Sequence, residues 1–195
     1  MQKNLSVGCL VMAAGNARRF GDNKLAAMVH GKTLIERALD AIPQEGFSRV
    51  VVVTQYAEVE ALAVERGFTV IWNRHPDWGI SHTISLGTEE LQKDCDAICY
   101  MVSDQPLLRR ESIAGALAFF RENSDHIVGL SHNGKRGNPC IFPRKFYDEL
   151  IALREDLGGN TVIRAHEDAL LLYEVDKQEL TDVDTPQALR DLTKV

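Results

Sequence analysis

Small and cationic residues follow the first apolar run of the sequence, at the point where that run ends. The segment begins with Ala13, Ala14 and Gly15, and it continues to Arg19 and Lys24. Small residues let a ligand approach the backbone closely, and cationic side chains bind phosphate oxygens. The pattern is neither a Walker A loop nor G-x-G-x-x-G, which occurs nowhere in the chain. We therefore predict a polyphosphate-binding loop of another type, in preference to an exposed turn with surface cations.

Acidic residues occupy comparable positions in two later segments. Asp104 comes just after the apolar run 97–102, and Asp182 and Asp184 alternate ahead of a proline. A carboxylate at the end of a strand, beside a phosphate-binding loop, suits Mg²⁺, which prefers one or two carboxylates together with substrate phosphates. Residues two apart in an extended segment point to one side, so Asp182 and Asp184 can share a metal ion with Asp104. The alternatives are a turn or helix cap at Asp104 and an N-cap at Thr185.

A polar loop that starts at Asn73 leads into the next apolar segment. Ser81 and Thr83, near the expected start of a helix, either cap that helix or hydrogen-bond the edge of a nucleobase. The run Gly79-Ile-Ser-His-Thr83 departs from the G-x-S-x-G nucleophile elbow because Thr83 replaces the second glycine, so a serine hydrolase is disfavoured. The histidines form no i, i+4 pair, and we predict no zinc site.

Composition and charge narrow the class of protein. The chain has 195 residues, which favours one domain spanning 1–195, and 22 basic against 28 acidic residues give a net charge of −6. Such a chain is a poor binder of nucleic acid. No apolar run approaches the roughly 18 residues of a membrane-spanning helix, so we expect no membrane association and a cytoplasmic location. The four dispersed cysteines, without a C-x-x-C pair, are expected to be reduced and mostly buried.

The elements that position these residues follow from the apolar pattern. Short β-branched runs alternate with segments of helical periodicity, including 33–42 and 113–120, which is typical of βα units around a mostly parallel sheet. The Asn-Gly pair within 131–138 predicts a hairpin turn and hence an antiparallel excursion. We therefore expect a single-domain, Rossmann-like α/β fold, in which ligands bind at the carboxyl ends of strands. The expected strands are 7–12, 49–54, 68–72, 97–102, 126–130, 139–142 and 170–175.

Taken together, these motifs resemble the molybdenum cofactor cytidylyltransferases of the MocA-like group, within the MobA-like nucleotidyltransferase family, over essentially the whole chain. The family patterns A-A-G-x-S-x-R-M-G-x-x-K, Gly-Asp-Gln-Pro and Asp-x-Asp-Thr-Pro occur in the family's order. The matching residues are Ala13, Ala14, Gly15, Arg19, Gly21, Lys24, Asp104, Gln105, Pro106, Asp182, Asp184, Thr185 and Pro186. The segments 79–81 and 137–139 resemble the family's Gly-Met-Ser segment and Gly-x-Pro turn. Departures are Ala17, Phe20, Ser103 and Asn160.

The last departure concerns the acceptor, which is the substrate that receives the nucleotide. Asn160 stands where the family commonly has an arginine, and that arginine would help to hold the acceptor's phosphate. The resemblance implies a GT-A-like nucleotidyltransferase fold. It also implies transfer of CMP from CTP to the terminal phosphate of molybdopterin, with release of pyrophosphate and no protein nucleophile. Positioning and charge neutralisation carry such reactions. The implied catalytic residues are Arg19, Lys24 and Asp104, and Asp104 and Asp184 are the implied ligands of Mg²⁺.

The same resemblance assigns the binding residues. Nucleotide binding is expected at Ala13, Ala14, Gly15, Arg19, Lys24, Asn73, Ser81 and Thr83. Acceptor binding is expected at Gly137, Asn138 and Pro139. The Ala-Ala pair favours CTP, since similar families with Gly-Gly at this point use GTP.

Alternatives lie within the same fold and outside it. A guanylyltransferase or a sugar-phosphate nucleotidyltransferase would share the site and differ in its pockets. The alternative from another class is a non-catalytic accessory protein that hands finished cofactor to a molybdenum hydroxylase apoprotein. If the chain is an enzyme, the same apoprotein is the protein partner that we consider for it. A pure carrier has no need of a metal ligand beside a triphosphate loop. Asp104, Arg19 and Lys24 therefore favour catalysis.

Overall fold

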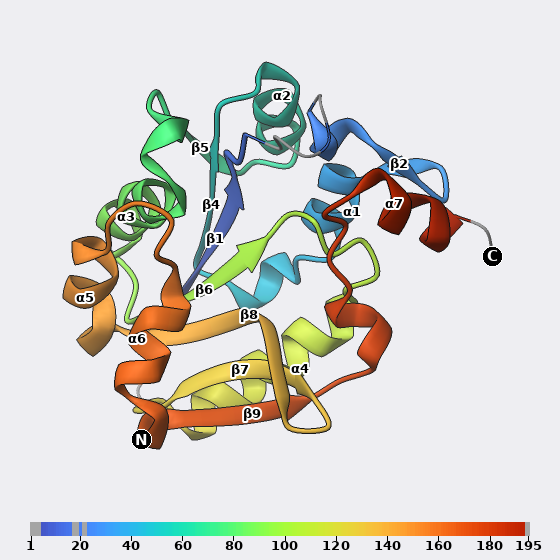
Figure 1. Ribbon diagram of the computed structural model, residues 1–195. Helices are drawn as coiled ribbons and strands as arrows, with labels where there is room; N and C mark the ends of the chain where they lie inside the picture. Colours follow the sequence, from blue (N-terminus) through green and yellow to red (C-terminus); the bar gives the residue numbers. More distant parts are fainter. Residues whose placement is uncertain (1–4, 17–19, 21–22, 194–195) are drawn as a thin grey trace.

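The computed structural model describes residues 5–16, 20 and 23–193 of the chain. Within these residues, seven strands form one sheet in the order β5–β4–β1–β6–β8–β7–β9 (Figure 1). Neighbouring strands are parallel except that β8 is antiparallel to both β6 and β7. The expected α/β fold with a mostly parallel sheet and an antiparallel excursion is confirmed. The strands of this sheet are β1 (Val7–Ala13), β4 (Arg49–Thr54), β5 (Thr69–Trp72), β6 (Ala97–Val102), β7 (Ile127–His132), β8 (Lys135–Pro143) and β9 (Leu170–Glu174).

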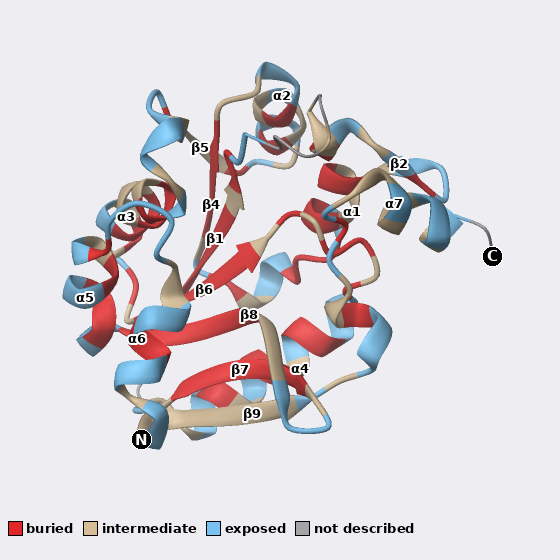
Figure 2. Cartoon of the chain, viewed as in Figure 1, coloured by how far each residue is buried: buried red, intermediate tan, exposed pale blue. Residues whose placement is uncertain are grey.

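Helices cover both faces of the sheet, and the central strands between them are buried (Figure 2). One core contains residues of α1, α2 and α4, and the other contains residues of α3, α5 and α6. A small hairpin of β2 (Met28–Val29) and β3 (Lys32–Thr33) packs near α7. The helices are α1 (Leu34–Asp40), α2 (Ala57–Glu65), α3 (Ile80–Leu91), α4 (Arg110–Glu122), α5 (Tyr147–Ala152), α6 (Gly159–Ala165) and α7 (Pro186–Thr193). None of the helices in the described residues is long and apolar enough to cross a membrane.

Strand β1 divides its side chains between the two cores. Cys9, Val11 and Ala13 belong to the core that α1, α2 and α4 cover, and Leu10 and Ala14 belong to the core that α3 covers. Successive side chains of a strand point to opposite faces of the sheet, which explains this alternation. As a result, the two neighbouring alanines at the carboxyl end of β1 face opposite sides.

The hairpin between β7 and β8 is tighter than predicted. Only Asn133 and Gly134 lie between the two strands, and their φ angles are 50° and 74°. Two successive residues with positive φ form the tight hairpin turn that Asn-Gly favours. Residues 135–138, which the sequence analysis assigned to a turn, therefore belong to β8.

The ends of two helices match the sequence signals. The side chain of Thr33 accepts from the backbone N–H of Glu36, and the backbone N–H of Thr33 donates to the side chain of Glu36 in return, which forms a capping box at the start of α1. The Thr185 hydroxyl accepts from the backbone N–H of Ala188 at 3.1 Å, so Thr185 caps α7, which begins at Pro186. All four cysteines are free and buried, as expected.

Candidate active site

A cleft of about 460 Å³ opens at the carboxyl ends of β1 and β6, on the face of the sheet that α3 covers. Parallel strands place their carboxyl ends at one edge, where ligands of open α/β sheets bind. Five of the residues predicted to bind nucleotide or metal line this cleft. They are Ala14, Gly15, Lys24, Thr83 and Asp104.

The residues that follow β4 hold the loop that follows β1. The hydroxyl of Thr54 donates to the carbonyl of residue 13 at 3.0 Å, and Gln55 Nε2 donates to that of residue 14 at 2.8 Å. The hydroxyl of Tyr56 donates to the carbonyl of residue 15 at 2.7 Å. These bonds fix the path of the loop along the cleft. The sequence analysis did not single out Gln55 or Tyr56, because their contacts depend on the parallel register of β4 against β1.

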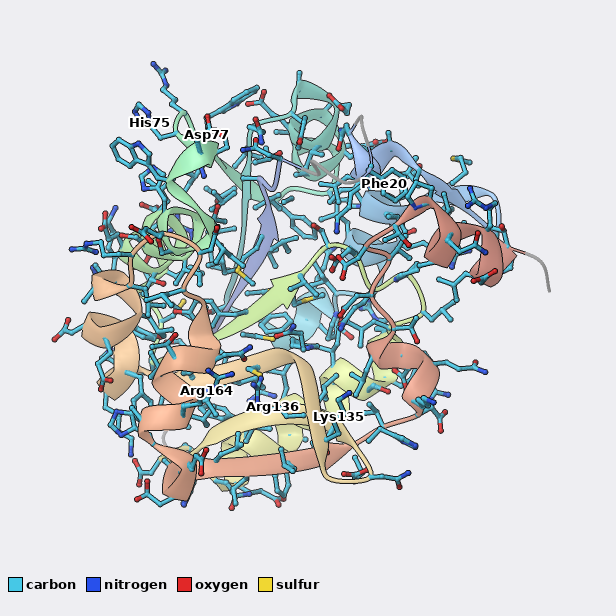
Figure 3. All side chains as sticks on the ribbon, viewed as in Figure 1. Phe20, His75, Asp77, Lys135, Arg136 and Arg164 are labelled. Atoms are coloured by element: carbon cyan, nitrogen blue, oxygen red, sulfur yellow. The ribbon has the colours of Figure 1, made fainter. Side chains whose placement is uncertain are left out.

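A bridge of polar side chains joins this loop to the segment before α3. Asn16 Nδ2 donates to Asp77 Oδ1 at 2.8 Å, and Asn16 Oδ1 accepts from Gln55 Nε2 at 2.9 Å. Both Asn16 and Asp77 line the cleft. Asp77 belongs to a short 3₁₀ turn, Pro76–Trp78, at the end of the loop that leads into α3 (Figure 3). The bridge therefore connects the two walls of the cleft.

Lys24 lies among the acidic residues of two other segments. Its Nζ donates to Asp104 Oδ2 at 2.7 Å and lies 3.4 Å from Asp184 Oδ1. The backbone N–H of Val183 donates to the carbonyl of Asp104 at 2.9 Å, which brings the two acidic segments together. The Val183 side chain is fully buried beside β2 and α1. Asp182 and Asp184, one residue to either side, consequently turn toward Asp104 and Lys24, as the spacing of two predicts.

Burial strengthens the interaction between Lys24 and Asp104. Their side chains are 19% and 18% exposed, so solvent screens the two charges only partly. Burial alone lowers the pKa of Lys24. The charge and hydrogen bond of Asp104, with a further contribution from Asp184, outweigh burial and raise the pKa of Lys24 above its ordinary value. Lys24 is therefore positively charged at neutral pH.

Asp182 makes a different contact. Its Oδ1 accepts from Gln105 Nε2 at 2.9 Å. Burial, and then the charge of Asp104, raise the pKa of Asp182. In the described part of the chain, no group of three or more Asp, Glu, His or Cys side chains is arranged to hold a metal ion. The three carboxylates therefore do not form one joint site, and Asp104 and Asp184 are the pair that Lys24 brings together.

One oxygen of Asp104 is unsatisfied in the described structure. Asp104 Oδ1 is buried and has no hydrogen-bond partner among the residues that the structure describes. An unsatisfied buried carboxylate oxygen is unfavourable unless a ligand binds to it. Carboxylate oxygens are the donors that Mg²⁺ prefers, and Mg²⁺ completes its shell with water and substrate phosphates. Asp104 and Asp184 therefore fit a divalent cation that binds together with a phosphorylated substrate.

Asn73 and Thr83 form a buried pair at the α3 side of the cleft. Asn73 Nδ2 donates to Thr83 Oγ1 at 3.1 Å, and Asn73 Oδ1 accepts from the backbone N–H of His75 at 2.9 Å. Thr83 lines the cleft, whereas Asn73 is only 1% exposed and lies behind Thr83. Asn73 thus fixes the orientation of the Thr83 hydroxyl and does not itself reach the cleft.

Ser81 faces a second cavity, of about 780 Å³, next to the first. Its backbone N–H donates to the carbonyl of Glu155 at 3.1 Å. The two cavities meet at Gly79, which lines both. Gly79 has a φ of +86°, and a Cβ at this position would lie 2.1 Å from the Glu155 carbonyl oxygen. The close approach of these two backbone segments therefore requires glycine.

The remaining predicted residues lie elsewhere. Ala13 does not line the cleft, because the alternation along β1 turns its methyl group toward the opposite core. Gly137, Asn138 and Pro139 lie inside β8 and not in a turn, because the two-residue hairpin turn ends before them. They do not line the cleft either. Arg19, predicted to be catalytic, lies outside the described residues.

The sheet order, the cleft at the carboxyl ends of β1 and β6, and similar solved structures define a nucleotidyltransferase fold. Rv0371c from Mycobacterium tuberculosis H37Rv superposes with a TM-score of 0.84 and 21% sequence identity, and covers 99% of this chain and 100% of that chain. The same protein has been solved in complex with manganese. Molybdopterin-guanine dinucleotide biosynthesis protein A from Archaeoglobus fulgidus has a TM-score of 0.69 and 19% identity, covering 96% and 97% of the two chains.

Sequence comparison gives the family. The purine catabolism protein PucB of Bacillus subtilis (strain 168) is 26% identical over 188 residues, which are 90% of each chain. The model of the MobA-like NTP transferase domain matches residues 9–170. The chain belongs to this family, and it is a nucleotidyltransferase of the MobA-like type.

Proposed function

We propose that this protein transfers CMP from CTP to the terminal phosphate of molybdopterin and releases pyrophosphate. The observation that carries the reaction type is the Lys24–Asp104 pair at the cleft, with Asp104 Oδ1 buried and unpartnered among the described residues. Membership of the MobA-like family and the similarity in fold to a molybdopterin-guanine dinucleotide biosynthesis protein support the acceptor. The Ala-Ala pair at 13–14 supports CTP.

The chemistry requires two polyanions to meet. An oxygen of the acceptor's phosphate attacks the α-phosphorus of CTP in line, and the bond from that phosphorus to the bridging oxygen of the β-phosphate breaks. Pyrophosphate leaves with the bond's electron pair. In this proposal Lys24 binds triphosphate oxygens and offsets the charge that develops on the leaving group, and Arg19 assists from the loop after β1. No protein nucleophile takes part.

Asp104 and Asp184 are the residues that would hold Mg²⁺, which supplies charge neutralisation on phosphate oxygens when it is bound. The manganese complex of Rv0371c supports a divalent cation in a protein of this fold. Ser103 assists by position: its hydroxyl donates to the carbonyl of Met12 at 2.8 Å and ties the end of β6 to β1. Asp104 is thereby held at the mouth of the cleft next to the loop that binds phosphate.

Selection of the base falls to Ala14 and Thr83 in this proposal. The methyl group of Ala14 faces the cleft and reduces the room for a purine. Thr83 Oγ1 already accepts a hydrogen bond from Asn73, so the hydroxyl proton of Thr83 is free to be donated. Cytosine presents a carbonyl oxygen and a ring nitrogen that accept such a bond. Guanine presents such acceptors too, so in this proposal the Thr83 hydroxyl binds the base and the bulk of the Ala14 methyl group disfavours the larger purine.

The direct test is pyrophosphate release by the purified protein with Mg²⁺ and either CTP or GTP, with and without molybdopterin. We expect release only when molybdopterin is present, and a rate with CTP about tenfold or more above that with GTP, which corresponds to about 1.4 kcal/mol. Faster release with GTP would replace CMP transfer by GMP transfer. No release with either nucleotide would remove molybdopterin as the acceptor.

A further inference from the structure

Arg136, in β8, carries a positive charge that no carboxylate neutralises within the described residues. Its guanidinium donates to Asn160 Oδ1 at 2.5 Å and to Cys140 Sγ at 3.4 Å. Both partners are neutral, since burial raises the pKa of the Cys140 thiol despite the nearby guanidinium. Other partly buried arginines, such as Arg49 and Arg66, form ion pairs with acidic side chains. Arg136, in contrast to these two, is half-buried and has only neutral partners among the described residues.

The Arg136 side chain lies on the same face of the sheet as the cleft. It passes over Gly129, where a Cβ would come within 2.9 Å of Arg136 Cδ, and it ends beside Cys140 in the core that α3 and α6 cover. Asn160 is in the first turn of α6 and comes four residues after Asp156, which lines the cleft. The guanidinium therefore lies next to the segment that borders the nucleotide cleft, beyond Asp156.

Two further cations belong to the same elements. Lys135 precedes Arg136 in β8, and Arg164 lies one turn beyond Asn160 in α6 (Figure 3). Both are exposed, and neither forms an ion pair within residues 5–16, 20 and 23–193. The chain as a whole has a net charge of −6. Of these two, Arg164 shares its helix with Asn160, the partner of Arg136, whereas Lys135 is adjacent to Arg136 in the strand and points to the opposite face. Positive charge of this kind attracts anions.

We infer that Arg136 binds an anionic group of the acceptor substrate, and this inference rests on the proposed function. Two of the five N–H groups of its guanidinium are used by Asn160 and Cys140, which leaves three for phosphate oxygens. Asn160 stands where members of the resembled family commonly have arginine. In this chain the Arg136 guanidinium, which comes from β8, is held by Asn160. The cation is therefore supplied by β8 and not by α6.

Steady-state kinetics of Arg136→Gln test this role. We expect the KM for molybdopterin to rise about tenfold or more, the loss expected for one charge-assisted hydrogen bond, with the KM for CTP changed less than about twofold. Arg136→Lys should recover part of the loss because it keeps the charge. The control is Arg121→Gln: Arg121 donates to the carbonyl of Gly46, lies in α4 and has no ion-pair partner in the described residues.

Equal effects on both KM values, or none on that of molybdopterin, would overturn the inference. A second measurement does not depend on turnover. Inorganic phosphate is titrated into Lys24→Ala, which lacks the main cation of the cleft, and into Lys24→Ala/Arg136→Gln and Lys24→Ala/Arg121→Gln. The Arg136 variant should bind phosphate at least about tenfold more weakly than the other two. Equal phosphate affinities would refute a role for Arg136 even if molybdopterin proves not to be the acceptor.

Discussion

Replacing Asp104 with asparagine keeps the size of the side chain and removes its charge, so it tests the electrostatic role of this carboxylate. Asp104 Oδ2 lies 2.7 Å from Lys24 Nζ, and its other oxygen is buried without a partner in the described residues. Asparagine can neither neutralise Lys24 nor hold a divalent cation as a carboxylate does. We expect the variant to fold and to lose nearly all turnover.

The magnitude follows from the burial of the pair. With side chains 18% and 19% exposed, an effective dielectric constant of about 20 is appropriate, at which two unit charges about 4 Å apart attract by about 4 kcal/mol. A divalent cation held by Asp104 would gain a comparable amount. A hundredfold fall in kcat corresponds to about 2.7 kcal/mol, which is about two thirds of that attraction. The expected loss in Asp104→Asn is therefore at least about a hundredfold.

The assay is pyrophosphate release at saturating CTP, Mg²⁺ and molybdopterin, with thermal melting as the check on folding. Asp182→Asn is the matched control, because the same chemical change leaves an oxygen that still accepts from Gln105 Nε2. We expect it to lose less than about threefold in kcat. Retention of more than about a tenth of the wild-type kcat by Asp104→Asn would refute this role for the carboxylate, and so would equal losses in the two variants.

Three further outcomes are expected. Asp182→Asn should melt above the wild type at pH 7, because burial and a neighbouring carboxylate raise the pKa of Asp182 in the folded state and its ionisation there costs stability. The difference should close as the pH falls below the ordinary pKa of 3.8, and a constant difference in melts between about pH 3 and 8 would contradict this. Ala14→Gly should raise the transfer rate with GTP and leave the rate with CTP nearly unchanged. Ala13→Gly should leave the preference for CTP intact and lower the free energy of unfolding, measured in urea, by about 0.5–1 kcal/mol. A larger change in nucleotide preference from Ala13→Gly than from Ala14→Gly would refute the assignment of base selection to Ala14. Gly79→Ala should lower the free energy of unfolding by about 2 kcal/mol or more, since the new Cβ would meet a backbone carbonyl at 2.1 Å. Gly158→Ala, whose Cβ would have its nearest neighbouring atom at 3.8 Å, should lower it by less than about 0.5 kcal/mol in the same assay. Equal costs would show that the two loops separate easily.

The central strands could be predicted because their sequence pattern and their burial agree. The apolar runs of β4 and β6 begin and end where the strands do, since both are buried between two layers of helices. The short elements carry no such signal. Helices α5 and α6 have six and seven residues, and they are stabilised by packing in the core with α3. The β2–β3 hairpin likewise has only two residues in each strand.

The candidate site was predictable in its charged residues and less so in its walls. Motif order indicated Lys24 and Asp104, which lie together as expected. Ser81 and Thr83 are two positions apart on a helix, and such residues point about 200° apart, so only Thr83 lines the cleft. The contact between Arg136 and Asn160 joins residues 24 positions apart on different elements. No local pattern encodes a contact of that kind.

The fate of the phosphates of CTP tests nucleotidyl transfer at this site most directly. The protein is incubated with Mg²⁺ and molybdopterin and with CTP labelled either at the α- or at the γ-phosphorus. The account predicts that the α-label appears in the molybdopterin product and the γ-label in pyrophosphate, and that Lys24→Ala and Asp104→Asn slow both together. Transfer of the γ-label to molybdopterin, or α-label transfer that is indifferent to both substitutions, would contradict it.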